Sequence, residues 1–106
     1  MWCPSIYSDD CNGSMPAICA TSAQAAATVT STGMNCRLTW TCPIGTSAYY
    51  YTGMNSTATP YPGDFAQCFM PPNNNWYLPD GTTEITAVAC QTAPIPFAIV
   101  VVPVPP

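Results

Sequence analysis

The residues of this chain that can carry chemistry are few, and most of them are cysteines. The sequence has seven cysteines and a single basic residue, Arg37, and it lacks histidine and lysine. General acid–base catalysis needs a group that titrates near neutral pH, and neither histidine nor lysine is there to supply one. A thiol nucleophile needs a neighbouring base that lowers its pKa, and Arg37 is a poor base. We therefore expect no enzyme activity and no cofactor.

The cysteines are spread over almost the whole chain, at Cys3, Cys11, Cys19, Cys36, Cys42, Cys68 and Cys90. A zinc site needs paired C-x-x-C or histidine spacings, and the gaps here are too long, so we expect no metal. A single domain of this size buries a limited core, and disulfides in an oxidising compartment supplement such cores. Because seven is odd, one thiol stays free, pairs with another chain, or pairs with a segment outside this sequence. Spacing alone leaves the connectivity open.

The five acids are Asp9, Asp10, Asp64, Asp80 and Glu84. Adjacent aspartates in a turn favour capping of backbone amides over catalysis, which is what we expect of Asp9 and Asp10. Asp64 and Glu84 could converge as a glycosidase pair, but their spacing indicates solvated strand ends. The chain has no basic surface for nucleic acid or an anionic membrane, and no apolar run of about 20 residues to form a transmembrane helix. We expect neither partner.

Two glycosylation sequons fit an extracellular protein, at Asn12 and at Asn55. Asn55 is the better candidate, because the third residue of its sequon is threonine and its surroundings have the composition of a loop. The first residues lack the charged-then-apolar pattern of a signal peptide, so we expect a mature, trimmed or recombinant form. Glycans would supply the solvation that so few charges do not.

Short antiparallel strands are predicted to position these residues. In residues 36–42 strict alternation places Cys36, Leu38, Trp40 and Cys42 on one face, which is typical of a half-buried strand. Residues 1–20 have the composition of turns pinned by disulfides, residues 53–63 that of a long loop, and residues 79–81 that of a tight hairpin turn. Further strands are predicted at residues 26–32, 47–52, 64–70, 76–78 and 84–91, the last with its inward face left open.

These elements predict an all-β fold, a small disulfide-stapled antiparallel β-sandwich or irregular barrel with short strands and long Pro/Gly-rich loops. Thirteen prolines limit the sheets to short elements. We expect Trp40 and Trp76 to pack on disulfides inside the fold. Tyr49, Tyr50 and Tyr51 are the candidate ligand contacts on an exposed face. The domain spans residues 1–92, and an apolar tail spans residues 93–106.

The tail carries no charge, and its six residues 97–102 combine high β propensity with flanking prolines. An exposed segment of this kind aggregates unless something covers it. It can be a last strand of its own domain, a linker, or a strand donated to a neighbouring copy. The residues expected to mediate self-association are Phe97, Ile99, Val100, Val101 and Val102.

The chain resembles the small six-cysteine domains of unknown function found in secreted nematode proteins. The resemblance covers about residues 3–92, and a weaker likeness is to sushi-type modules, whose last cysteine intervals are usually shorter. Cys19 and the tail have no counterpart in the family. The matching positions are Cys3, Cys11, Cys36, Thr39, Thr41, Cys42, Cys68, Trp76, Gly81, Ile85, Val88 and Cys90. The resemblance implies secretion and a disulfide-stabilised fold, and it says nothing about catalysis.

We therefore expect an extracellular structural protein that self-associates into a homo-oligomer or homo-polymer, such as a filament joined through a donated C-terminal strand. The alternative is a monomeric secreted surface module that binds carbohydrate or protein through its tyrosines. The two differ in a measurable property, because only the first changes size when the tail is removed.

Overall fold

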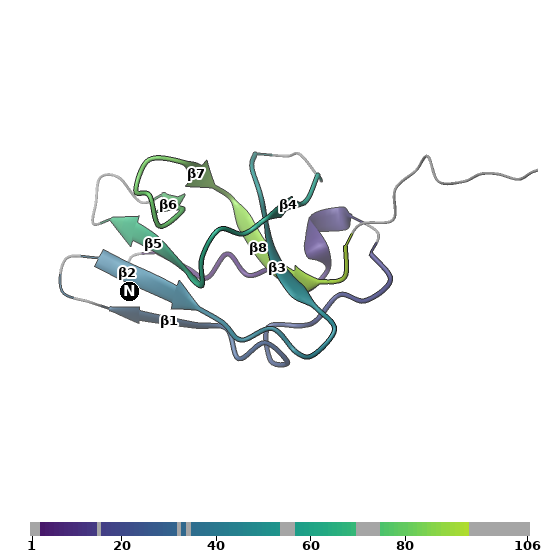
Figure 1. The fold of residues 1–106 in the computed structure, drawn as a ribbon. Helices are drawn as coiled ribbons and strands as arrows, with labels where there is room; N and C mark the ends of the chain where they lie inside the picture. Colours follow the sequence, from purple (N-terminus) through teal and green to yellow (C-terminus); the bar gives the residue numbers. More distant parts are fainter. Residues whose placement is uncertain are drawn as a thin grey trace, which may run out of the picture.

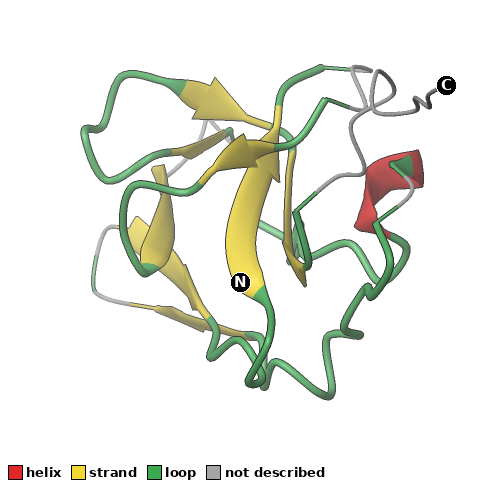
Figure 2. Cartoon of the chain, turned by 45° about the vertical axis from the view of Figure 1, so that its right-hand side comes forward, coloured by secondary structure: helices red, strands yellow, loops and turns green. Residues whose placement is uncertain are grey.

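The computed structural model describes residues 3–14, 16–31, 33, 35–53, 57–69 and 75–93. Within these residues the fold is all-β, with two antiparallel sheets and one short 3-10 turn, η1 (Cys11–Gly13) (Figures 1 and 2). The predicted fold class, a small disulfide-stapled β-sandwich, is confirmed. The described strands are β1 (Thr28–Ser31), β2 (Asn35–Thr39), β3 (Ser47–Tyr51), β4 (Thr59–Pro60), β5 (Phe65–Phe69), β6 (Trp76–Tyr77), β7 (Glu84–Ile85) and β8 (Ala87–Gln91).

The larger sheet has the strand order β1-β2-β5-β6-β7. The predicted alternation holds in β2, where Cys36 and Leu38 are buried and Arg37 between them is exposed. Arg37 lies on the outer face with its guanidinium 4.1 Å from the centroid of the Phe65 ring, a cation–π contact with the neighbouring strand β5. The inner faces of these strands build the main hydrophobic core.

The smaller sheet has the order β4-β3-β8, and its strand β8 is buried along its whole length. Val88 packs into the main core, whereas Ala87 and Ala89 pack into a second cluster with Tyr51. The sequence did not decide which face of this strand points inward, and the structure shows that both faces are buried. Because both faces are covered, β8 lacks the polar alternation of a half-exposed strand.

Three predicted boundaries are wrong, each because the chain bonds to a distant segment. The predicted strand 36–42 ends at Thr39, and the N–H of Thr41 donates to Ala25 O at 2.7 Å in the preceding turn. The predicted strand 84–91 is broken at Thr86, whose N–H donates to Tyr51 O at 2.9 Å. This bond moves the chain from the larger sheet (β7) to the smaller one (β8). The predicted loop 53–63 contains β4, which pairs with β3.

Three disulfides brace this arrangement. Cys42–Cys90 connects the segment after β2 to β8, and so joins the two sheets across 48 residues of sequence. Cys3–Cys68 fastens the N-terminal segment to β5, and Cys11–Cys19 closes a local loop. Of the two cysteines that the alternation placed on one face, Cys42 bridges to β8 of the other sheet, whereas Cys36 is the odd cysteine and is a buried free thiol.

The predicted hairpin turn after β6 is present and is capped by Asp80. Its carboxylate accepts from the N–H of Thr82 at 2.8 Å, and from the N–H of Thr83 at 3.0 Å and its hydroxyl at 2.8 Å. Gly81 within the turn has a φ of +76°, a backbone conformation that glycine adopts without strain. The cap therefore links this turn to the charge state of one carboxylate.

The hydrogen bonds from Thr83 and then Thr82 lower the pKa of Asp80 from 3.8 to about 2. A carboxyl whose pKa is depressed on folding contributes stability that is fully present above the unfolded value, and that is lost as the pH falls through the folded value. We expect the Asp80 carboxyl to titrate near pH 2 in a carbon-detected NMR experiment on the folded protein. Thr83→Val, which removes only the hydroxyl donor, should raise this midpoint. A midpoint of 3.8 in the folded protein would show that the cap is absent.

Candidate functional site

The most concentrated set of reactive groups is a cluster of three sulfurs in the main core. Cys3, Cys36 and Cys68 are each at most 1% exposed and belong to the same buried cluster. Cys3 and Cys68 are bonded, and Cys36 lies directly opposite Cys68 in the β2–β5 register. The free thiol and one of the disulfides are thus neighbours. No group of three metal-ligating side chains suited to an ion is found among the residues described.

The tyrosine run does not form one exposed platform. Tyr51 is 1% exposed and lies in the second core cluster, so it is removed from the candidate ligand contacts. Tyr50 is half-buried and packs edge-on against Tyr61, with ring centroids 5.8 Å apart. Tyr49 is also half-buried and lies between Pro60 of β4 and Ala89 of β8 in the register. Only parts of Tyr49 and Tyr50 remain accessible to a ligand.

An aromatic cluster connects the two sheets where the platform was expected. Trp40 and Tyr61 meet edge-on, with ring centroids 4.9 Å apart, and Tyr61 also contacts Tyr50. The hydroxyl of Tyr61 donates to Phe65 O at 2.6 Å. Burial, and then the negative charges of Asp80 and Asp64, raises the pKa of Tyr61 well above its ordinary value. Tyr61 is therefore a neutral structural donor and no acid or base near neutral pH.

Both tryptophans in the described residues pack as expected. Trp40 lies against the cluster that contains Cys90, together with Cys42, and Trp76 is 3% exposed in the cluster that contains Cys3 and Cys68. The indole N–H of Trp76 donates to Pro4 O at 2.8 Å. Both tryptophans therefore stabilise the disulfide-bearing core, and Trp76 offers little surface for stacking on a sugar, whereas Trp40 is half-buried.

A polar interior that the sequence did not predict lies beside β8. Gln91 is fully buried, and its side-chain oxygen accepts from the hydroxyl of Tyr51. The same hydroxyl lies 2.9 Å from Ser14 Oγ. A buried glutamine needs partners, and a tyrosine 40 residues away supplies one. This network fixes the end of β8 against the N-terminal segment.

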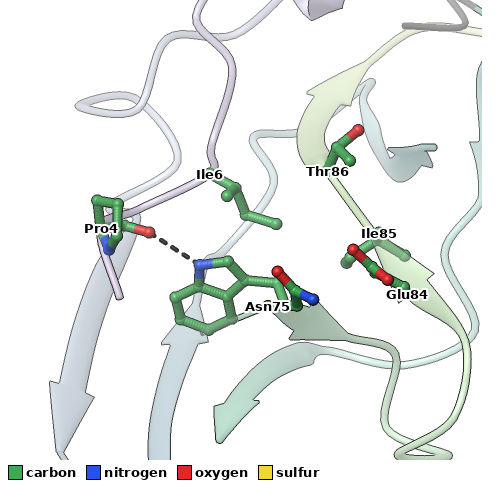
Figure 3. Close-up of a pocket in the computed structure, with 7 residues that line it drawn as sticks. Pro4, Ile6, Asn75, Glu84, Ile85 and Thr86 are labelled. Carbon is green, nitrogen blue, oxygen red and sulfur yellow. Dashed lines mark hydrogen bonds between the residues drawn. The ribbon is translucent and has the colours of Figure 1, made fainter. Parts of the chain in front are cut away.

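A shallow cavity of about 230 Å³ lies between the N-terminal segment and the β6–β7 hairpin (Figure 3). Pro4 and Ile6 border it on one side, and Glu84, Ile85 and Thr86 on the other (Figure 3). Small-molecule sites usually measure roughly 300–1,000 Å³. This cavity is smaller, and the Trp76 indole N–H beside it is already bonded, so it makes a weak ligand site.

Asp9 and Asp10 cap backbone amides, whereas Asp64 and Glu84 lie at or beside strands. Asp9 accepts from the N–H of Ser22 at 2.7 Å, and Asp10 accepts from the N–H of Asn12 at 3.1 Å. The predicted capping of backbone amides is confirmed. Glu84 lies in β7, and Asp64 lies immediately before β5. Nothing in the described residues joins these two carboxyls into a catalytic pair.

Of the two predicted glycosylation sites, the structure describes only Asn12. Asn12 lies in η1, inside the loop closed by Cys11–Cys19, with a φ of 50°. The hydroxyl of Ser14, the third residue of its sequon, contacts Tyr51. Asn55 and the tail residues Phe97, Ile99, Val100, Val101 and Val102 lie outside the described residues. Their proposed roles stay predictions from sequence.

The free edges of the sheets differ in how well they are protected. β4 and β7 are two residues long, and they carry Pro60 and Glu84 respectively. The outer side of β8 is covered by bridges to Tyr7 and Cys19. β1 is four residues long, has no charge or proline, and pairs only with β2 in the described sheet. Proline, charge and short length are the devices that protect edges, and β1 has only its modest length.

Comparison with known proteins does not extend these observations, because no family model, curated protein or solved structure matches the chain. The resemblance to nematode six-cysteine domains and to sushi-type modules therefore stays a prediction. In the described residues no helix is long and apolar enough to cross a membrane. Three disulfides fit an extracellular protein.

Proposed function

We propose that this chain is an extracellular structural module that self-associates, and that residues 97–102 of one copy add as a strand to the β1 edge of the next copy. The observation that carries the proposal is the contrast between β1 and the other sheet edges. Among the described residues β1 pairs only with β2, so its other edge has backbone groups for a further strand, and it carries no charge or proline. The tail offers an uncharged segment of high β propensity. Addition of a strand to an open edge satisfies both.

Donation to a second copy is favoured over pairing within one chain by the layout of the fold. Thr92 is fastened by its N–H to Ile18 O at 3.1 Å, which fixes the place from which the tail must start. Figure 1 shows the end of β8 beside η1, on the opposite side of the domain from β1. A tail that starts at this end of the domain starts away from the β1 edge of its own copy. The β1 edge of a neighbouring copy is therefore the simpler partner. Repetition of this contact, which is not self-complementary, gives an open chain of subunits.

The alternative function, a monomeric secreted module that binds carbohydrate or protein, has less support. Tyr51 is buried, Trp76 is 3% exposed, and Tyr50 is engaged with Tyr61. A sugar-binding platform needs exposed aromatic faces. Glycosylation at Asn55 and a secreted location belong to the proposal in either case.

Deletion of residues 94–106 should convert the assembled protein to monomer, because it removes the donated strand. The measurement is light scattering coupled to size-exclusion chromatography over a range of protein concentrations. If the shortened chain retains the size distribution of the full chain, strand donation by the tail is wrong.

The edge itself is tested with Thr30→Glu. Thr30 is exposed and lies opposite Arg37 in the register, so the new carboxylate gains a cross-strand partner in its own fold while it places a charge on the open edge. We expect at least about a tenfold weaker association, or about 1.4 kcal/mol. Thr59→Glu on the β4 edge is the matched control and should assemble normally. Equal effects of the two variants would contradict the choice of β1.

A further inference from the structure

The free thiol of Cys36 is placed to exchange with the disulfide beside it. Cys36 and Cys68 are direct partners in the antiparallel register of β2 and β5, the neighbouring strands at the left of Figure 1. Directly opposite residues have Cα atoms about 4.5–5.5 Å apart and side chains on the same face. A disulfide needs Cα atoms about 4.4–6.8 Å apart. The sheet therefore holds Cys36 and Cys68 at a separation that allows them to bond without backbone movement.

Cys68 is instead bonded to Cys3, with a Cα–Cα distance of 6.4 Å. All three cysteines lie in the same buried cluster. The two possible partners of Cys68 differ in how they are held. Cys36 is held within strand β2. Cys3 lies outside the strands, and the residues that follow it, Pro4 and Ser5, are exposed.

We propose that the core has two covalent states, related by exchange among these three sulfurs, and that Cys3 is the cysteine through which two copies can be joined. The Cys36 thiol loses its proton, and its sulfur attacks Cys68 Sγ. The Cys36–Cys68 bond forms, the Cys3–Cys68 bond breaks, and Cys3 leaves as a thiolate that takes up a proton. Three disulfides and one thiol are present before and after, so this step needs no oxidant or reductant.

Burial determines when the exchange occurs. Cys36 is 0% exposed, so solvent does not reach its thiol to remove the proton while the fold is closed, and attack proceeds when the N-terminal segment opens or during folding. After exchange the new disulfide lies inside the sheet and the thiol lies on the N-terminal segment. Two released Cys3 thiols then form an interchain disulfide by reaction with a small-molecule disulfide, which is reduced to two thiols.

This covalent link is independent of the donated tail strand, because it needs Cys3, Cys36 and Cys68 and none of the tail residues. It therefore does not rest on the proposed function. The link is detected only under non-reducing conditions after denaturation, whereas tail-mediated assembly is non-covalent and is lost on denaturation. Failure of one proposal is thus distinguishable from failure of the other.

The test maps the disulfides of the full chain after incubation with a mixture of reduced and oxidised glutathione at pH 8. Digestion with pepsin in acid prevents exchange during the analysis, and mass spectrometry identifies the linked peptides. We expect wild-type protein to yield both Cys3–Cys68 and Cys36–Cys68 peptides, together with a covalent dimer fraction linked Cys3 to Cys3 that disappears on reduction. Cys3→Ser should form Cys36–Cys68 fully, leave no free thiol and give no dimer.

Cys36→Ser is the matched variant. It removes the attacking sulfur, so it should retain only Cys3–Cys68 and lose the crosslinked dimer. If the buried serine hydroxyl prevents folding, Cys36→Ala is used in place of Cys36→Ser. Retention of the Cys42–Cys90 peptide shows that the variant is folded. Cys36 and Cys68 both reduced in oxidised Cys3→Ser protein would overturn the proposal. So would a dimer of unchanged yield in the Cys36 variant, or one linked through another cysteine.

Discussion

Replacement of both Cys42 and Cys90 by alanine should lower the free energy of unfolding by about 4 kcal/mol. The two residues are separated by 48 positions, and the chain-entropy model gives a stabilisation of about this size for a loop of that length. The bond also joins the segment after β2 to β8, and so holds together the two sheets that share the core. Urea unfolding of the non-reduced double variant, followed by tryptophan fluorescence, measures the loss.

The matched control is the double alanine variant of Cys11 and Cys19. This bond spans only 8 positions and closes a local loop, so the same model gives about 2.5 kcal/mol. The contacts around Cys90 persist without its sulfur, since its N–H bonds Tyr7 Oη at 3.0 Å and its carbonyl accepts from Ala20 N at 2.9 Å. A smaller loss for the Cys42–Cys90 variant than for the control would refute the entropic account of this bond.

Trp76→Ala should lower the free energy of unfolding by about 3–5 kcal/mol, the usual range for truncation of a buried tryptophan. Trp76 is 3% exposed, belongs to the main core, and holds the N-terminal segment through its bond to Pro4 O. The variant therefore leaves a cavity beside the Cys3–Cys68 disulfide and frees the segment that carries Cys3. The same urea titration measures the loss.

Trp76→Phe separates packing from hydrogen bonding. It retains an aromatic ring in the core but removes the indole N–H, so it should lose only a fraction of the effect, with the missing hydrogen bond accounting for about 1 kcal/mol. Equal losses in the alanine and phenylalanine variants would mean that the bond to Pro4 matters more than the buried ring.

Local pattern was enough to predict the parts of the fold whose partners are near in sequence. Alternation in residues 36–42 placed Cys36 and Leu38 inside, and Pro79 followed by Asp80 and Gly81 predicted the hairpin turn. The change of sheet at Thr86 could not be predicted, because its cause is a bond to Tyr51, which is 35 residues away. The spacing of apolar residues along the sequence carries no information about which sheet a strand joins.

The candidate site shows the same division. The sequence predicted disulfides and one odd cysteine, but not the pairing, because the pairing depends on which strands are neighbours. Once β2 and β5 are known to pair, Cys36 opposite Cys68 is the expected bond, yet Cys68 is joined to Cys3 from 65 positions away. Tyr51 was expected on a surface because it belongs to an aromatic run, and nothing in the local pattern indicated that Gln91 is buried. Their mutual hydrogen bond explains why both are buried.

We infer that covalent sulfur links, rather than ionic or acid–base groups, hold this fold together. Alkylation and intact-mass analysis of folded protein, denatured with and without reductant, test it most directly. We expect one alkylated cysteine without reductant, all seven after reduction, and linked peptides for Cys42–Cys90 and Cys11–Cys19. Correctly folded protein in which all seven cysteines are alkylated without reductant would contradict the account.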